Sequence, residues 1–305
     1  MPPIGTRLDW ALVDVAVPRQ ASRLPGVSMA GFRHRAQALV DIAMVAHPSV
    51  TLIVDLSDGE GIVYDLHGRR EKGSVFIGLL PGDLRAAGTM GDCLQVRLSP
   101  ISAAMLFGTS IDLTGTVAAL TDVWGPHFEE RLRLAPSWNQ RFDIVVDVLG
   151  RRLSTSPSLD PEVVHTWRRT STSRGRLRIE HLADETGWSR KRLWSRFRSQ
   201  LGITPKRAAQ LVRFDHAAHL LAAGHSPATT AADSGYADQS HLHREITAFA
   251  NTTPTALAAA PWLAIDDIAW PTTSVRSCSC VSSACEWRDA SRCRFPRTRA
   301  RPRTE

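Results

Sequence analysis

The chain has 305 residues, which is enough for two domains with a core in each. With 43% hydrophobic and 22% charged residues it reads as globular, and this composition excludes a largely disordered chain. No apolar run approaches the ~18 residues needed to span a bilayer, and the first residues lack the basic-then-apolar layout of a secretion signal.

Four of the five cysteines lie near the end of the sequence, and only Cys93 lies in the part that reads as globular. Such a distribution does not suit the disulfide framework of a secreted domain. We therefore expect a cytoplasmic protein without a membrane-spanning segment.

The net charge of +7 is concentrated in one region of the chain. Residues 1–159 hold 15 basic and 16 acidic residues, whereas residues 160–260 hold 14 and 9. Within residues 168–213 there are 13 basic residues and 3 acidic ones. A local excess of this kind is typical of a surface that binds a polyanion such as double-stranded DNA.

The first half of the sequence predicts an α+β domain. Residues 1–36 contain several prolines and little periodicity, so we expect them to be partly irregular. Short β-branched stretches separated by Gly, Pro and Asp predict mostly antiparallel strands at residues 50–56, 61–66, 75–80 and 93–98. Flanking helices are expected after Ser99-Pro100, where Pro occupies the first helical position, and over residues 137–153. Residues 1–153 thus form the expected domain.

Residues 154–161 have the composition of a linker, and residues 162–260 read as helical. This helical part contains the same pattern twice. In each copy an Ala lies four residues before a Gly. Further on, a Leu lies four residues before a second apolar residue, Phe197 or Ile246, and that residue lies eight before a Pro. The first copy runs from Leu182 to Pro205 and the second from Thr230 to Pro254.

Each repeated position has a mechanical reason. Ala183 and Ala231 allow two helices to cross closely, and Gly187 and Gly235 supply the positive φ of a tight turn between helices. Good N-cap residues follow at Ser189 and Asp238, and the αL-tolerant residues Gly202 and Asn251 end the second helices. The apolar stripes expected on those helices consist of Leu193, Phe197 and Leu201, and of Leu242, Ile246 and Phe249. Two matched copies within the basic segment predict an all-α domain of two helix-turn-helix units.

The second copy resembles a known family. The sequence Gly-Tyr-Ala-Asp-Gln-Ser-His-Leu at residues 235–242, followed by Arg244 and Thr253-Pro254, is similar to the signature of AraC/XylS-type transcription regulators. Arg213-Phe214 and Leu220-Leu221 match the long helix that joins the two units of that family. The resemblance covers about residues 176–259, roughly a quarter of the chain.

The resemblance implies a seven-helix DNA-binding domain that reads two adjacent segments of the major groove about one turn (~34 Å) apart. One groove segment would receive Gln239, Ser240, His243 and Arg244, and the other Arg190, Lys191, Arg192 and Ser195. Thr204 and Lys206 would lie nearer the phosphates, and Arg198 is expected to strengthen binding to any duplex.

Departures from the family pattern concern the second unit. Pro227 and Thr230 occupy positions that are usually aliphatic, and Ile246 and Asn251 replace the usual Phe and Gly. We expect the first helix of this unit to be short or loosely packed.

The family usually places effector binding or dimerisation in the N-terminal domain, which makes a small-molecule effector and a second copy of the chain candidate partners, with RNA polymerase as a third. The histidines there (His34, His47, His67 and His127) are scattered without a metal-binding spacing. No Gly-x-Ser-x-Gly elbow or phosphate loop is present. We expect no catalytic residue, metal or cofactor.

Two alternatives remain. DNA alkyl-transfer repair proteins fuse a reactive cysteine to this type of DNA-binding module, which would give Cys93 a catalytic role, although their Pro-Cys-His-Arg context is absent. The third interpretation is an effector-binding protein with a vestigial DNA-binding module. Residues 261–305, rich in Cys and Arg, lose all apolar periodicity, so we expect a disordered tail.

Overall fold

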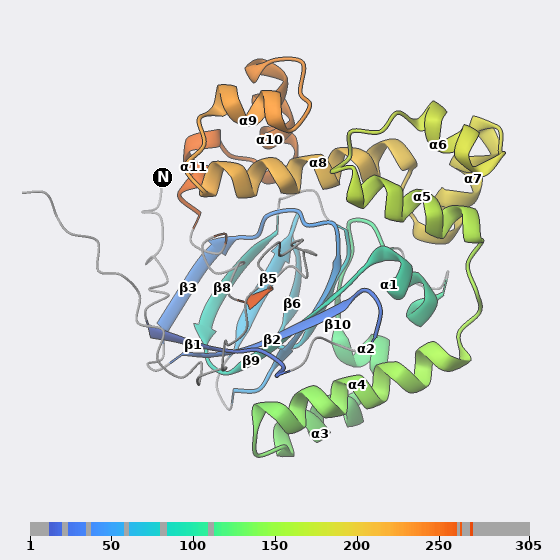
Figure 1. The fold of residues 1–305 in the computed structure, drawn as a ribbon. Coiled ribbons are helices and arrows are strands. Elements are labelled where there is room, and N and C mark those ends of the chain that lie inside the picture. The colour runs from blue at the N-terminus through green and yellow to red at the C-terminus, as the bar shows by residue number, and fades with distance from the viewer. Residues whose placement is uncertain are drawn as a thin grey trace, which may run out of the picture. The chain divides into compact units, whose positions relative to one another are not determined.

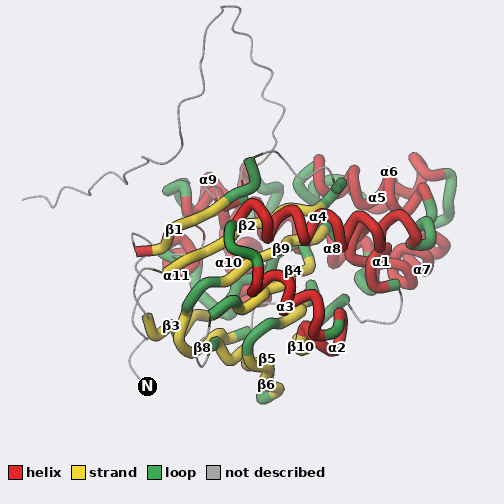
Figure 2. The backbone as a smooth tube through the Cα atoms, turned by 90° about the horizontal axis from the view of Figure 1, so that it is seen from below, coloured by secondary structure: helices red, strands yellow, loops and turns green. Residues whose placement is uncertain are grey.

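The computed structural model describes residues 12–19, 24–34, 38–57, 61–79, 84–108, 113–260, 263, 269 and 270. Its N-terminal part contains two antiparallel sheets (Figures 1 and 2). The six-stranded sheet comprises, in spatial order, β1 (Val13–Ala16), β2 (Val27–His34), β9 (Cys93–Leu98), β4 (Val50–Asp55), β7 (Val75–Ile77) and β10 (Val117–Ala119). The four-stranded sheet comprises β3 (Ala38–Ala43), β8 (Arg85–Met90), β5 (Ile62–Leu66) and β6 (Arg69–Lys72).

The six-stranded sheet is covered on both faces. Successive side chains of a strand point to opposite faces, and in β4 Val50, Leu52 and Val54 belong to the cluster formed with the helices. Ile53 belongs instead to the cluster formed with Tyr64 and other residues of the second sheet. The N-terminal part therefore has three layers, namely sheet, sheet and helices.

Helices cover the outer face of the larger sheet. They are α1 (Pro100–Phe107), α2 (Leu120–Trp124), α3 (Pro126–Leu134) and α4 (Trp138–Thr155). Ser99 caps α1 by accepting the N–H of Ser102, and Ser137 caps α4 in the same way through Gln140. Trp124 is part of the core, where its ring stacks on Phe128 at 5.2 Å between centroids.

The four predicted strands and the two predicted helix starts are present, with ends that differ by a few residues. The expectation of irregular chain over residues 1–36 was wrong where β1 and β2 lie. The sequence gives no alternation there because β2 is buried on both faces, with Met29, Ala30 and Phe32 all inaccessible.

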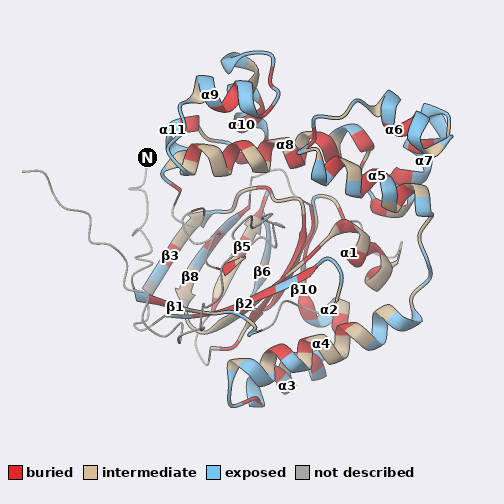
Figure 3. Ribbon diagram, viewed as in Figure 1, coloured by how far each residue is buried: buried red, intermediate tan, exposed pale blue. Residues whose placement is uncertain are grey.

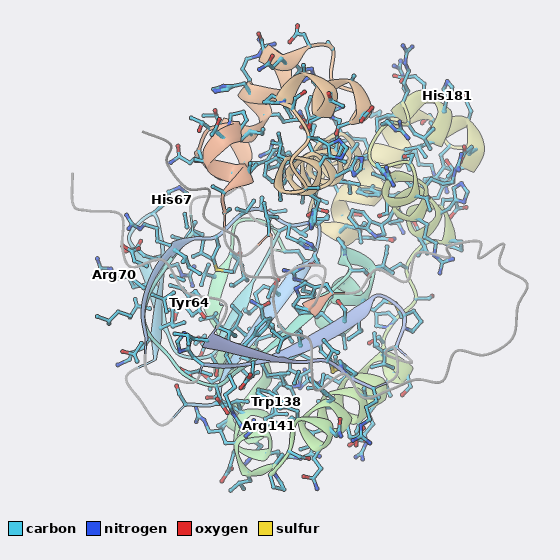
Figure 4. All side chains as sticks on the ribbon, turned by 60° about the vertical axis from the view of Figure 1, so that its left-hand side comes forward. Tyr64, His67, Arg70, Trp138, Arg141 and His181 are labelled. Atoms are coloured by element: carbon cyan, nitrogen blue, oxygen red, sulfur yellow. The ribbon has the colours of Figure 1, made fainter. Side chains whose placement is uncertain are left out.

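Gly31 interrupts the apolar run of β2 for a steric reason. A Cβ at this position would lie 2.3 Å from the ring of Trp138 at the start of α4, so only glycine lets the helix approach the strand. Figure 4 shows Trp138 and Arg141 together on α4, and the Arg141 guanidinium lies 4.7 Å from the indole centroid.

The C-terminal part is all α-helical in the described residues. It contains α5 (Pro161–Thr172), α6 (Ile179–Thr186), α7 (Arg190–Leu201), α8 (Pro205–Ala222), α9 (Pro227–Asp233), α10 (Gln239–Ala250) and α11 (Pro254–Ala258). These seven helices match the expected number. In the described part of the chain no helix combines the length and apolarity needed to cross a membrane.

The expected tail, residues 261–305, lies outside the described residues except for Leu263, Ala269 and Trp270. Leu263 and Ala269 are buried, and the Trp270 ring lies 4.1 Å from the guanidinium carbon of Arg97.

Candidate nucleic-acid interface

Each helix-turn-helix unit is closed by a glycine turn and an N-cap. Gly187 has a φ of 66° between α6 and α7, and Gly235 has a φ of 75° between α9 and α10. Ser189 Oγ accepts the N–H of Arg192 at 3.3 Å, and Asp238 Oδ1 accepts that of His241 at 2.6 Å. These contacts satisfy N–H groups that the first turn of a helix otherwise leaves unpaired.

The two units also end alike. Gly202 (φ 72°) and Asn251 (φ 47°) are both in the left-handed conformation at the ends of α7 and α10. Both helices contain 12 residues, and their first residues, 190 and 239, differ by the same 49 positions as their last, 201 and 250. Residues 189–205 of the first unit therefore align without a gap with residues 238–254 of the second.

Apolar stripes hold the second helices in place. The stripe of α7 consists of the fully buried residues Leu193, Phe197 and Leu201. On α10, Leu242 and Ile246 are fully buried, and Phe249 stacks on Phe214 of α8 at 5.1 Å between centroids. The opposite sides of both helices are exposed (Figure 3).

Helix α8 joins the two units, which lie toward its opposite ends in Figure 1. At 1.5 Å per residue its 18 residues span about 27 Å. Phe214 and Ala217 of α8 are completely buried. The length of this packed connector is of the same order as one turn of DNA, ~34 Å.

The residues predicted to bind DNA lie in these two units, except Lys206, which lies in the first turn of α8. Ten of them are exposed, and the eleventh, Thr204, is half-buried because it caps α8 through the N–H of Arg207 at 3.2 Å. The exposed ones are Arg190, Lys191, Arg192, Ser195, Arg198, Lys206, Gln239, Ser240, His243 and Arg244.

Several basic side chains of α7 already have partners within the chain. Arg190 contacts Glu180 at 3.2 Å, the Arg192 guanidinium lies 4.5 Å from the Trp188 ring centroid, and that of Arg198 lies 5.2 Å from the Trp194 ring. No hydrogen bond or ion pair links Lys191 or Arg244 to another described residue. The same holds for Lys206, so these three exposed cations are available to a ligand.

Arg196, also on α7, has a structural role instead. Its Nε and Nη2 atoms donate to the two carboxylate oxygens of Asp160 at 2.6 and 2.9 Å, which joins α7 to the start of α5. This contact lowers the pKa of Asp160, chiefly through the hydrogen bond from Arg196. Arg196 was not among the predicted DNA-binding residues.

The sequence interpretation missed Trp194, which is 45% exposed on α7. The repeat could have revealed it. When Leu193 is aligned with Leu242, Trp194 occupies the position equivalent to His243, which was predicted to bind DNA.

It also missed a buried ion pair between α8 and α10. Arg213 Nη2 donates to Glu245 Oε1 at 3.0 Å, and the Glu245 side chain is only 5% exposed. The Arg213 guanidinium also lies 4.7 Å from the Tyr236 ring centroid. Burial opposes the charge on Arg213, but the contacts with Glu245 outweigh it and the pKa of Arg213 is raised. The pair fixes the orientation of α10 on α8.

Cys93 does not have the environment of a reactive thiol. It lies at the start of β9 and lines a small pocket between the two sheets with Ile53, Asp55 and Tyr64. Burial, reinforced by the charges of Asp55 and Asp92, raises the pKa of the Cys93 thiol to about 12. A nucleophilic cysteine needs a populated thiolate, so this environment argues against the alkyl-transfer alternative.

Comparisons with known proteins agree with this geometry. Residues 182–260 match the family model described as "Helix-turn-helix domain". A 64-residue segment is 38% identical to the "Uncharacterized HTH-type transcriptional regulator YbfI" of Bacillus subtilis (strain 168); the match covers 21% of this chain and 23% of that protein. The chain thus matches less than a quarter of the length of this curated relative.

Two solved structures also show a distant likeness. The structure of ToxT from Vibrio cholerae O395 has a TM-score of 0.45 at 11% identity and covers 77% of this chain and 98% of its own. The C-terminal domain of AraT, a response regulator from Geobacillus stearothermophilus, has a TM-score of 0.32 at 20% identity and covers 34% and 88%.

Proposed function

We propose that the protein is a sequence-specific DNA-binding transcriptional regulator of the AraC type that reads two adjacent segments of the major groove. The match of residues 182–260 to a helix-turn-helix family model supports this. The observation that supports this most directly is the pair of units with equal second helices, equivalent caps and exposed polar faces on α7 and α10. An exposed helix of this size fits the major groove of B-DNA.

Within this proposal the two exposed faces differ in their contacts. On α10, Gln239 and Arg244 have side chains that can pair bidentately with adenine and guanine, and Ser240 and His243 lie beside them. On α7, the corresponding contacts come from Arg190, Lys191, Arg192 and Ser195. The contacts to the phosphate backbone of the DNA come from Arg198, Thr204 and Lys206. They position the protein on the duplex but do not select a sequence.

The N-terminal α+β part, residues 1–153, would receive a small-molecule effector or pair with a second copy of the chain, joined to the DNA-binding domain (residues 162–260) by residues 154–161. RNA polymerase is a further candidate partner, and the regulator would act in the cytoplasm.

The proposal is tested by selecting bound fragments from a random pool of duplexes with the full-length protein and footprinting the preferred fragment. We expect a preferred site of about two helical turns, protected on one face. Binding that is equal for the selected and a scrambled duplex at moderate salt would contradict the proposal.

The reading role of α10 is tested by Arg244→Ala. We expect it to relax the preference at one base step, at a cost of about 1–3 kcal/mol on the selected site, because a guanine would lose its bidentate partner. Lys206→Ala is the matched control, since loss of a phosphate contact should weaken selected and scrambled duplexes alike. An unchanged preference profile for Arg244→Ala would show that our contacts for the second unit are wrong.

A further inference from the structure

Trp194 is the one aromatic residue among the large exposed hydrophobic side chains of the described residues. Single exposed apolar residues are common on protein surfaces and need no special explanation. Its position is what distinguishes Trp194, because it lies in the middle of α7 rather than at a chain end or loop tip.

The repeat defines that position. With Leu193 aligned on Leu242, Trp194 occupies the place of His243, and both side chains are exposed in helices of equal length with equivalent caps. His243 belongs to the face of α10 that we assign to the DNA groove. Trp194 therefore lies on the equivalent face of α7.

The neighbours of Trp194 support the same placement. Residues three and four apart share a helix face, so Lys191 and Arg198 flank the indole, and Ser195 follows it directly. All three are exposed, and the Arg198 guanidinium lies 5.2 Å from the indole centroid. Helix α7 has five basic residues and no acidic one. A positively charged surface with an exposed indole is complementary to a nucleic acid, because the phosphates carry negative charge and the base edges offer apolar surface.

The chemistry of the indole selects the feature that it would recognise. The ring offers a large apolar surface and one N–H donor, whereas bidentate pairing with guanine or adenine needs a guanidinium or amide. The apolar feature on a base edge in the major groove is the C5 methyl group of thymine. We propose that Trp194 is a specificity-determining residue that selects thymine at one position of the half-site bound by α7. This inference rests on the proposed function.

The test removes the methyl group without disturbing base pairing. In the duplex selected by the wild-type, full-length protein, each thymine of the α7 half-site is replaced in turn by deoxyuridine. We expect one replacement to weaken binding about four-fold, which corresponds to withdrawing roughly one methyl group from water. Trp194→Ala should bind the thymine and deoxyuridine duplexes equally, because the methyl group then has no partner.

Two variants control the experiment. Trp194→Phe keeps an apolar ring and should retain a reduced preference for thymine over deoxyuridine. Leu134→Ala, which truncates a 77% exposed side chain on α3, should bind both duplexes as the wild type does. Circular dichroism and thermal unfolding of each variant establish that the fold is retained.

The outcomes separate the inference from the proposed function. If the wild-type protein selects no duplex, the proposed function itself fails. If the wild type selects a site but no thymine replacement weakens binding, the role assigned to Trp194 is wrong. The same follows if Trp194→Ala responds to deoxyuridine as the wild type does. In both cases the proposed function is unaffected.

Discussion

His216 on α8 is held neutral by its surroundings. Its Nε2 atom lies 3.1 Å from Nη1 of Arg174, and burial, followed by the charges of Arg174 and Arg176, lowers the pKa of His216 to about 4. A neutral imidazole can accept the Arg174 hydrogen bond through Nε2, whereas an imidazolium cannot.

This lowered pKa predicts how stability depends on pH. Between the unfolded-state value near 6.5 and the folded-state value near 4, the unfolded chain binds a proton that the folded chain does not. The free energy of unfolding contributed by His216 is therefore fully present above pH 6.5 and is lost as the pH falls toward 4. We expect urea unfolding to show lower stability at pH 5 than at pH 7, with a weaker pH dependence in His216→Gln.

Measurements between pH 7 and pH 5 separate the contribution of His216 to the pH dependence of stability from that of Glu185. Glu185, whose pKa is lowered to about 2 by hydrogen bonds from Arg169 and His165, affects stability only in more acidic solution. The glutamine can still accept the Arg174 hydrogen bond but does not titrate. Equal pH dependence in the wild type and His216→Gln over this range would contradict the assignment.

At the scale of the element, α9 shows what the departures from the family pattern do. Pro227 fits, because it is the first helical residue after the N-cap Ser226. The helix has only 7 residues, as we expected for a short first helix. Thr230 in this helix and Ser234 at its C-cap are completely buried, and their hydroxyl groups have no hydrogen-bond partner among the described residues.

The unpaired hydroxyl of Thr230 predicts a stabilising substitution. Thr230→Val keeps the shape of the side chain and removes a buried polar group, so we expect the free energy of unfolding to rise by about 1 kcal/mol. Thr229→Val is the matched control in the same helix, because Thr229 is exposed and its hydroxyl lies 2.9 Å from Ser226 Oγ. Urea titration measures both, and a destabilised Thr230→Val would mean that the hydroxyl has a partner such as an ordered water.

Local sequence signals predicted the elements whose cause is local. The caps at Ser189 and Asp238 and the turn at Gly187 depend on a few neighbouring residues, so the two helix-turn-helix units could be derived almost completely. Strand β9 alternates buried and half-buried residues because one of its faces is less covered, and this alternation allowed the strand to be predicted from the sequence. Strand β2 gave no such pattern because both faces are buried.

Features that depend on distant residues could not be derived. The pairing of β2 with β9 joins residues 61 to 71 positions apart, and the contact between Arg213 and Glu245 depends on how α8 and α10 pack. Trp194 was missed for a different reason. An aromatic residue on a helix predicts a core position, and only the repeat places it on the exposed face.

For the whole molecule, the two units differ in charge although they share a geometry. Helix α7 has five basic residues and no acidic one, whereas on α10 the charges of Arg244 and Glu245 cancel. Two of the five cations, Arg190 and Arg196, already contact carboxylates of the chain. Affinity from counterion release should therefore come mainly from the first unit, where Arg198 of α7 is assigned to a phosphate.

This asymmetry predicts how binding depends on salt. Each phosphate neutralised by a cation adds about 0.9 to the slope of log affinity against log salt concentration. Arg198→Gln should lower that slope by about 0.9 on both selected and scrambled duplexes, because it removes the cation of α7 that we assign to a DNA phosphate. His243→Gln at the exposed face of α10, measured at pH 8, should leave the slope unchanged and alter the preference among duplexes. Titrations from low to moderate salt with both variants would contradict the asymmetry if the two slopes fell equally, since charge would then be shared by the two units.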